Sequence, residues 1–360
     1  MKPLLAILFM VGLSVQTFCQ KNRINVIAYY SGHYSGIDGY PVEKLTHIIY
    51  SFVHLKGNRL SVDSRGDSNT IRKLVSLKNR NPKLKVLLAL GGWGGCKNCS
   101  PVFSTAAGRE EFALSAKQAL DYFKADGIDI DWEYPAVKGY EGHPYSPEDK
   151  NNFTELIKAV RRVLGTSKEL SFAAGALREY LENSFEWNEL APYIDRVNLM
   201  TYDLVNSRNS YTGHHTPLYS TRFQKESTDN AVRYLDSLGF PGNKMVIGAA
   251  FYGRLFEGVD SVDNGLNRAG KFKNFITYLK LLPQFNTSNG YKTFWDDEAK
   301  APYAYSSSKK IFATFDNERS VELKTSYAIE KGLNGIMFWE LSQDRKKGGF
   351  VDAIWGKIPR

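Results

Sequence analysis

Short, nearly continuous apolar runs recur along the chain and alternate with segments in which apolar residues have helical spacing. Parallel strands covered on both faces have this pattern, because neither face meets water. The predicted strands cover residues 24–30, 46–53, 84–90, 126–135, 170–176, 196–201, 245–251 and 335–339, and the predicted helices cover about 69–80, 108–125, 147–164, 226–238 and 319–331. Ser146 and Pro147 indicate the cap and the first position of the helix at 147–164.

Eight such strands alternating with helices indicate an α/β fold, a TIM (β/α)8 barrel. The interval between the last two strands is longer than one crossover needs, and residues 255–313 contain many aromatic side chains. We predict that they form a small α+β insertion between strands seven and eight, on the catalytic face. The catalytic barrel itself is predicted to span residues 20–360.

The fourth predicted strand carries alternating acidic residues. Because successive side chains of a strand point to opposite faces, Asp129, Asp131 and Glu133 share one face. Crowded carboxylates force their pKa values apart, and proteins keep such crowding mainly where it performs chemistry. The alternatives are the wet face of an antiparallel strand, which the apolar neighbours disfavour, and a hard-metal site, which the lack of an oxygen-rich loop disfavours. We predict an acid cluster without a metal or other cofactor.

In a TIM barrel, chemistry takes place where the strands end. The predicted strand ends carry aromatic rings and few polar groups. Such rings beside one acid cluster suit a neutral sugar chain, because flat amphipathic rings match sugar faces. The glycines within residues 91–95 resemble a phosphate loop only loosely, since no Lys-Ser or Lys-Thr pair follows them. We therefore predict no phosphate or dinucleotide site.

The N-terminus has the composition of an export signal. A positively charged start is followed by an apolar run at residues 4–13 and by small and polar residues up to residue 20. The run is too short to cross a bilayer as a helix. We predict a signal peptide of residues 1–19 and a secreted or periplasmic protein. A lipid anchor on Cys19 is the competing interpretation, which Phe18 and Gln16 disfavour.

The net charge of +9 is scattered along the chain rather than clustered, so we predict no nucleic-acid partner. We also expect no membrane span and a monomer. Cys96 and Cys99 are predicted to form a local disulfide rather than a redox or zinc site, because no second cysteine pair exists after the signal. The adjacent His214 and His215 have no evident third ligand, which favours a loop role over zinc.

Residues 126–133, Asp-Gly-Ile-Asp-Ile-Asp-Trp-Glu, match the D-x-x-D-x-D-x-E signature of glycoside hydrolase family 18, the chitinases. Other segments that resemble the family are Leu90-Gly91-Gly92-Trp93, Met200-Thr201-Tyr202-Asp203, Tyr252-Gly253-Arg254 and Trp339. The resemblance covers nearly the whole chain after the signal, and residues 255–313 resemble the insertion domain of the bacterial chitinases. The family's usual Ser is Ala89 here, which removes one hydroxyl near the buried Asp pair.

The resemblance implies that Glu133 protonates the departing oxygen and later acts as a base for water. We expect partial burial and the charge of Asp131 to raise its pKa. The family uses substrate assistance: the N-acetyl carbonyl of the sugar attacks and forms an oxazolinium ion, with retention. Asp131 would orient the acetamido N–H, Asp129 would share a proton with Asp131, and Tyr202 would donate to the acetamido oxygen.

The resemblance also implies that Asp203 holds the sugar or the acid and that Trp339 forms the floor beneath the sugar whose bond breaks. The other predicted substrate-binding residues are Tyr29, Phe52, Gly92, Trp93, Tyr134, Met200, Tyr252 and Arg254. For Trp93 and Tyr252, plain packing is the alternative. For Asp126, a structural role at the start of the strand is favoured over a catalytic one.

These residues together imply a secreted chitinase that hydrolyses β-1,4 bonds in chitin or N-acetylglucosamine oligosaccharides. One alternative is an endo-β-N-acetylglucosaminidase that acts on N-glycans; the inserted subdomain and Trp339 favour chitin. The other is a lectin on the same barrel, which the presence of Glu133 disfavours.

Overall fold

The computed structural model describes residues 23–359. The predicted signal peptide, including Cys19, lies outside these residues. Within the described part of the chain, no helix combines the length and apolar character needed to cross a membrane.

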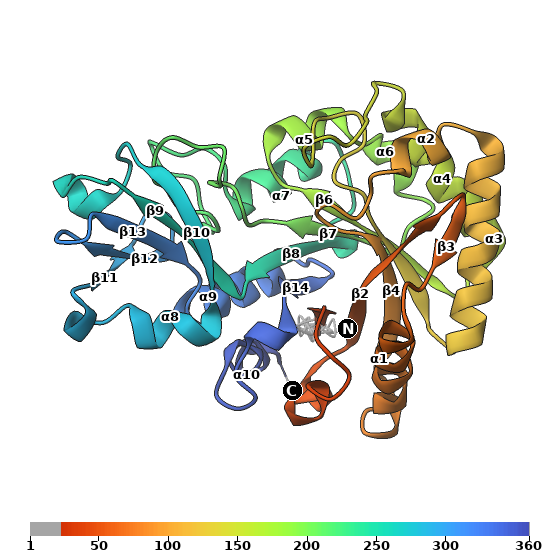
Figure 1. The fold of residues 1–360 in the computed structure, drawn as a ribbon, viewed down its shortest axis with the longest axis horizontal. Coiled ribbons are helices and arrows are strands. Elements are labelled where there is room, and N and C mark those ends of the chain that lie inside the picture. Colours follow the sequence, from red (N-terminus) through yellow and green to blue (C-terminus); the bar gives the residue numbers. More distant parts are fainter. Residues whose placement is uncertain (1–22, 360) are drawn as a thin grey trace, which may run out of the picture.

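Eight parallel strands close into a barrel (Figure 1). They are β1 (Asn25–Tyr30), β2 (His47–Lys56), β4 (Lys85–Gly91), β5 (Gly127–Asp131), β6 (Glu169–Gly175), β7 (Arg196–Met200), β8 (Met245–Ala250) and β14 (Gly335–Trp339). Their order is β1-β14-β8-β7-β6-β5-β4-β2, and pairing of β1 with β2 closes the ring. The predicted (β/α)8 barrel is confirmed. A short β3 (Arg59–Ser61) pairs antiparallel with the end of β2.

Helices surround the barrel, except α8 (Tyr278–Gln284), which lies against the second sheet described below (Figure 1). The other helices are α1 (Arg65–Ser76), α2 (Cys99–Phe103), α3 (Ala106–Phe123), α4 (Asp149–Leu164), α5 (Arg178–Asn183), α6 (Trp187–Leu190), α7 (Thr228–Ser237), α9 (Glu318–Glu330) and α10 (Phe350–Lys357). Helix α1 begins earlier than predicted because Ser64 caps it: its side chain accepts a hydrogen bond from the backbone N–H of Asp67.

Helix α4 begins later than the sequence indicates. Its N-cap is Glu148, so Ser146 is not the cap and Pro147 is not the first helical residue. Instead, the buried carboxylate of Asp149 accepts hydrogen bonds from the backbone N–H of Ser146, at 2.9 Å, and from the hydroxyl of Ser100, at 3.0 Å. One local and one long-range hydrogen bond thus hold the start of this helix, and local sequence rules do not reveal the second.

A second, antiparallel sheet stands beside the barrel (Figure 1). Its strands are β9 (Tyr252–Glu257), β10 (Lys271–Thr277), β11 (Lys292–Asp296), β12 (Ala301–Ser306) and β13 (Ile311–Phe315), in the order β10-β9-β13-β12-β11. The sheet lies between β8 and β14 in the chain, where we predicted the insertion, but it starts at Tyr252 rather than at residue 255. Because β8 leads almost directly into β9, the sheet is attached at the carboxyl edge of the barrel.

The side chains of β5 alternate between the two sides of the barrel wall. Ile128 and Ile130 are fully buried in the layer between the strands and the helices, in one cluster with Phe112 of α3. Asp129 and Asp131 are also buried, but they point into the barrel interior. Strand β5 therefore has an apolar face and an acidic face, as predicted.

Candidate active site

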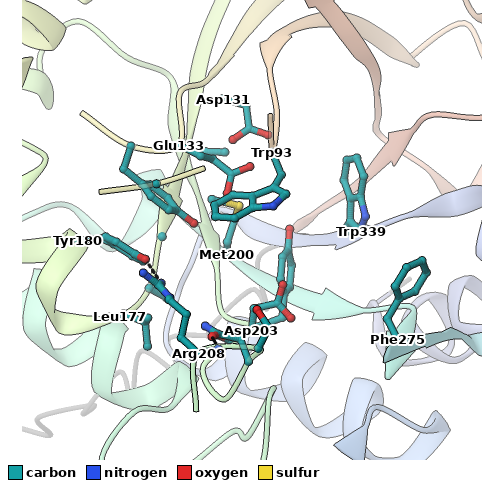
Figure 2. Close-up of a pocket in the computed structure, with 18 of the residues that line it drawn as sticks. Trp93, Asp131, Glu133, Leu177, Tyr180, Met200, Asp203, Arg208, Phe275 and Trp339 are labelled. Carbon is teal, nitrogen blue, oxygen red and sulfur yellow. Dashed lines mark hydrogen bonds between the residues drawn. The ribbon is translucent and has the colours of Figure 1, made fainter. Parts of the chain in front are cut away.

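A cavity of about 780 Å³ opens at the carboxyl ends of the barrel strands (Figure 2). Its lining includes all of the predicted site residues except two: Tyr29, Phe52, Trp93, Asp131, Glu133, Tyr134, Met200, Tyr202, Asp203, Tyr252, Arg254 and Trp339. Residues from the barrel loops and from the second sheet thus form one cavity. The two predicted residues outside the lining are Asp129 and Gly92.

Gly92 lies directly behind Phe52. A Cβ at Gly92 would come within 2.3 Å of the Phe52 ring, and the φ of 78° is in the left-handed region that favours glycine. A contact between Gly92 and the substrate stays a prediction, and the structure adds a packing reason for glycine at this position. Its absent side chain lets the Phe52 ring take its place in the cavity wall.

Asp129 lies beneath the cavity and is fully buried. Its carboxylate accepts hydrogen bonds from the hydroxyl of Tyr29, at 2.8 Å, from the hydroxyl of Ser171, at 2.6 Å, and from the amide of Asn198, at 3.0 Å. Burial raises the pKa of Asp129, and the hydrogen bonds from Ser171 and Tyr29 oppose that rise. Asp129 is thus a firmly held carboxyl group rather than a contact for substrate.

Ala89 is the strand neighbour of Asp129 on one side, and Ser171 is its neighbour on the other. Ala89 has no hydroxyl to offer, but Asp129 still has two hydroxyl donors, because Ser171 and Tyr29 both donate to it. The network beneath the acid cluster is therefore built from β1, β6 and β7.

Asp131 is 4% exposed, and its Oδ1 has no hydrogen-bond partner among the described residues. Burial raises its pKa well above the usual value, and the charges of Glu133 and Asp129 raise it further. A buried carboxyl oxygen without a partner at the cavity surface is free to bind a polar group of a ligand.

Burial raises the pKa of Glu133 from its usual 4.5 to about 7. Tyr134 opposes the rise by favouring the charged form, and the charge of Asp203 adds to it. Asp131 is a charged neighbour of Glu133, as the sequence led us to expect, because the repulsion between the two carboxyl groups is mutual. Asp203 is a second one, which sequence reasoning did not place there. A carboxyl group with this pKa still carries a proton near neutral pH, as a general acid must.

Asp203 forms a bidentate ion pair with Arg254 of β9. Nε of Arg254 donates to Oδ1 at 2.7 Å, and Nη2 donates to Oδ2 at 2.5 Å. Burial alone would raise the pKa of Asp203, but the approach of His215 and the charge of Arg254 hold it well below its usual range. Asp203 therefore stays charged, and the second sheet supplies the cation that keeps it so.

Tyr202 lies in the same wall, and its hydroxyl donates to the sulfur of Met337 at 3.8 Å. Burial raises the pKa of Tyr202 well above 10, and the charge of Asp131 raises it further. The hydroxyl therefore keeps its proton and can donate it in a hydrogen bond to a ligand. The ring of Tyr252 packs edge-on against Tyr202, with ring centres 6.0 Å apart.

Aromatic rings form two sides of the cavity (Figure 2). On one side, Trp339 stacks on Phe52 with ring centres 5.5 Å apart. On the other side, Tyr134 stacks on Tyr180 at 3.9 Å. At the rim, Trp93 packs against Tyr140 with ring centres 5.5 Å apart, yet it is 57% exposed, so part of its surface is open to contact.

Several functional residues escaped the sequence reasoning. Ser171 and Asn198 occupy inward positions of β6 and β7, and a polar residue at an inward position of an apolar strand is a signal that could have found them. Tyr180 and Arg208 also line the cavity, where Arg208 donates a hydrogen bond to the Tyr180 hydroxyl (Figure 2). They lie outside the strands, where no periodicity points to a site.

The remaining predictions concern residues near the site. Cys96 and Cys99 form the predicted disulfide. The carboxylate of Asp126 accepts the backbone N–H of Val86 at 2.7 Å and pairs with Lys78, as a structural role requires. The two loop histidines each face a carboxylate; His214 lies 3.0 Å from Asp296 of β11, outside the cavity lining.

A (β/α)8 barrel with a carboxyl group of raised pKa in a ring-lined cavity at its carboxyl edge has the architecture of a glycoside hydrolase. The comparisons with known proteins agree with this class. The family model "Glycosyl hydrolases family 18" matches residues 25–344. The chain belongs to this family, as the resemblance indicated, and it is a glycoside hydrolase of the chitinase type.

Among curated relatives, chitinase A1 of Niallia circulans is 36% identical over 309 residues, which cover 78% of this chain and 43% of that protein. The chain thus spans less than half of chitinase A1. Chitotriosidase-1 of Mus musculus is 32% identical over 326 residues, which cover 85% of this chain and 68% of that protein. A solved family 18 N-acetylglucosaminidase from Paenibacillus barengoltzii is 35% identical with a TM-score of 0.85, covering 93% of this chain and all of that one.

Proposed function

We propose that this protein hydrolyses β-1,4 bonds between N-acetylglucosamine units, with retention and by substrate assistance. The observation that carries the proposal is the pairing of Glu133, whose pKa is raised to about 7, with a buried Asp131 that has an unpartnered oxygen. The names of the relatives point the same way: chitinase A1 and chitotriosidase-1, and a solved chitinase of Ostrinia furnacalis, 27% identical, in complex with allosamidin.

In this proposal Glu133 protonates the oxygen of the leaving sugar. Hydrolysis through a departing alkoxide is slow, so a positioned acid contributes on the order of 10²- to 10⁴-fold to the rate. Glu133 is partly buried at the edge of the cavity, which keeps the proton on the carboxyl group until the substrate arrives. Once the leaving sugar has departed, the same carboxylate accepts a proton from water.

Asp131 and Tyr202 would hold the acetamido group. The unpartnered oxygen of Asp131 accepts its N–H, and the Tyr202 hydroxyl donates to its carbonyl oxygen. Held in this way, the carbonyl oxygen attacks the anomeric carbon and closes the oxazolinium ring. Once Glu133 has given its proton to the leaving oxygen, its carboxylate stabilises the positive charge of that ring, because Coulomb interactions are strong where water is excluded.

The cavity has the features of a cleft for a sugar chain rather than for a single sugar. Its volume of about 780 Å³ and the exposed ring of Trp93 leave room for several units. We also propose that the protein is exported, on the strength of the composition of residues 1–19. N-terminal sequencing of the mature protein from its natural host would test export; a mature chain that begins at Met1 would contradict it.

The test of the function is a product analysis with matched substrates. We expect cleavage of a chitin hexamer, slower or no release of glycans from a high-mannose glycoprotein, and no cleavage of a cellulose hexamer, which has the same linkage without the N-acetyl group. Proton NMR should show the β-anomer as the first product, as retention requires. Cleavage of the cellulose hexamer at a comparable rate would rule out substrate assistance, and faster release of glycans would favour the N-glycan alternative.

A further inference from the structure

His215 lies directly behind the wall of the active site. The residue has no exposed surface, and its Nδ1 lies 3.6 Å from Oδ1 of Asp203. Its backbone ties two regions together: the N–H donates to the hydroxyl of Thr314 on β13, and the carbonyl accepts the N–H of Leu204. The ring is thus fixed between the end of β7 and the second sheet.

Neither ring nitrogen of His215 has a hydrogen-bond partner within residues 23–359. A buried polar group without a partner costs on the order of 1–3 kcal/mol, so its presence calls for an explanation. Moving Nδ1 toward Asp203 by less than an ångström would give a normal hydrogen bond, because such bonds are about 2.7–3.2 Å long.

The groups that face His215 come from three parts of the fold. Asp203 follows β7, and Arg254 and Tyr252 lie on β9, with the Tyr252 ring centre 5.2 Å from that of His215. Asp316, which follows β13, also acts on the ring; its own charge is paired with Lys324 of α9 at 2.7 Å. His215 is therefore surrounded by two carboxylates that are each already paired with a cation.

We propose that His215 is a positioning residue for the reaction: its neutral ring donates Nδ1–H to Oδ1 of Asp203 and holds that carboxylate facing Glu133. The inference rests on the proposed role of Glu133 as the acid. Arg254 grips both oxygens of Asp203 from the side of the second sheet. A second donor on Oδ1, from the other side, resists rotation of the carboxylate away from Glu133.

The consequence for catalysis follows from the sign of the charge. Asp203 raises the pKa of Glu133, because a negative charge disfavours ionisation of a neighbouring carboxyl group. If Asp203 turned away, the pKa of Glu133 would fall, and the acid would lose its proton at a lower pH. Removal of the His215 ring should therefore shift the alkaline limb of the pH–rate profile toward acid and leave KM almost unchanged.

The test compares three variants on a chitin oligomer. His215→Leu should lower the apparent pKa of the alkaline limb by roughly half a unit. His215→Asn, whose amide N–H can take the place of Nδ1–H, should restore the limb to the wild-type position. His214→Leu is the matched control, because His214 is an equally buried neighbour that faces Asp296, away from the cavity; it should change thermal stability but not the limb.

A second measurement does not need turnover. Carbon NMR of protein labelled at the glutamate carboxyl carbons, with Glu133 assigned from Glu133→Gln, should show the same fall of its pKa in His215→Leu. If the wild-type protein does not cleave chitin but this shift is seen, the proposed function fails and the role of His215 stands. A folded His215→Leu with the wild-type limb, or an equal shift in His214→Leu, would overturn the inference.

Discussion

The two ends of the barrel surround a partly buried glutamate with opposite charges. At the amino end, Glu169 at the start of β6 accepts hydrogen bonds from Arg196, at 2.5 Å, and lies 3.0 Å from Nε2 of His47, while Lys85 also contacts it. Burial would raise the pKa of Glu169, but these partners hold it well below its usual range. At the carboxyl end, Glu133 has acids and rings around it, and its pKa rises to about 7.

The difference shows how one barrel keeps a stabilising carboxylate and a reactive carboxyl group in separate environments. A carboxylate surrounded by cations is always charged, so it can hold strands together but cannot deliver a proton. A carboxyl group surrounded by carboxylates and apolar groups keeps its proton and can release it. Parallel strands place all their amino ends on one face and all their carboxyl ends on the other, which keeps the two environments apart.

The largest expected effect comes from removing the acid. Glu133→Gln should lower kcat roughly 1,000-fold or more, because the amide cannot protonate the leaving oxygen, while the affinity for a chitin oligomer stays similar. Initial rates and calorimetric titration with the same oligomer would measure both. Glu169→Gln serves as the comparison and should retain most of the wild-type kcat. Near-normal turnover by Glu133→Gln would show that another group is the acid.

For stability, we expect the larger effect from Glu169 rather than from Glu133. Glu169→Gln should lower the free energy of unfolding by about 3 kcal/mol, because it leaves Arg196 buried with no carboxylate partner. Arg196 is 4% exposed, and two of its nitrogens already have no hydrogen-bond partner among the described residues. Urea unfolding of the two glutamine variants would measure the contrast. An unchanged urea midpoint for Glu169→Gln would show that the ion pairs of Glu169 do not stabilise the protein.

The pH dependence of stability should also have opposite signs. Because the folded-state pKa of Glu133 is raised, its contribution to stability is full below pH 4.5 and is lost as the pH rises toward 7. Glu169 has a depressed pKa, so its contribution is present above pH 4.5 and is lost in acid. Replacing Glu133 by Gln should thus stabilise the protein by about 3 kcal/mol more at pH 8 than at pH 4. Unfolding curves at both pH values provide the measurement, and an equal effect at both would contradict the raised pKa.

The smallest effect concerns the network beneath the acids. Ser171→Ala removes one of the hydrogen bonds to Asp129 and should cost about 1 kcal/mol of stability and a few-fold in kcat. Ser184→Ala is the control, because the Ser184 hydroxyl is also buried but has no partner within the described part of the chain. Thermal melts and initial rates would separate the pair. Equal losses in both variants would mean that the hydrogen bond from Ser171 has no special weight.

Much of the fold could be predicted from the pattern of residues. The eight strands and their alternation with helices follow from runs that are apolar on both faces, and the acidic face of β5 follows from the two-residue repeat. The cavity-lining positions of Glu133, Asp131 and Trp339 follow from the rule that strand ends meet at one face. These are local regularities, so they are present in the chain before it folds.

Contacts across the barrel had to wait for the structure. The donors to Asp129 come from β1, β6 and β7, and the order of residues does not reveal which inward side chains meet when a ring of strands closes. The partners of Asp203 likewise come from separate segments: Arg254 lies on the second sheet, and His215 lies in a loop. The chain thus dictates which face each residue occupies. Which residues touch is decided by the register of the strands, the closure of the barrel and the docking of the second sheet. All three depend on the packing of the whole molecule, so the sequence alone does not reveal them.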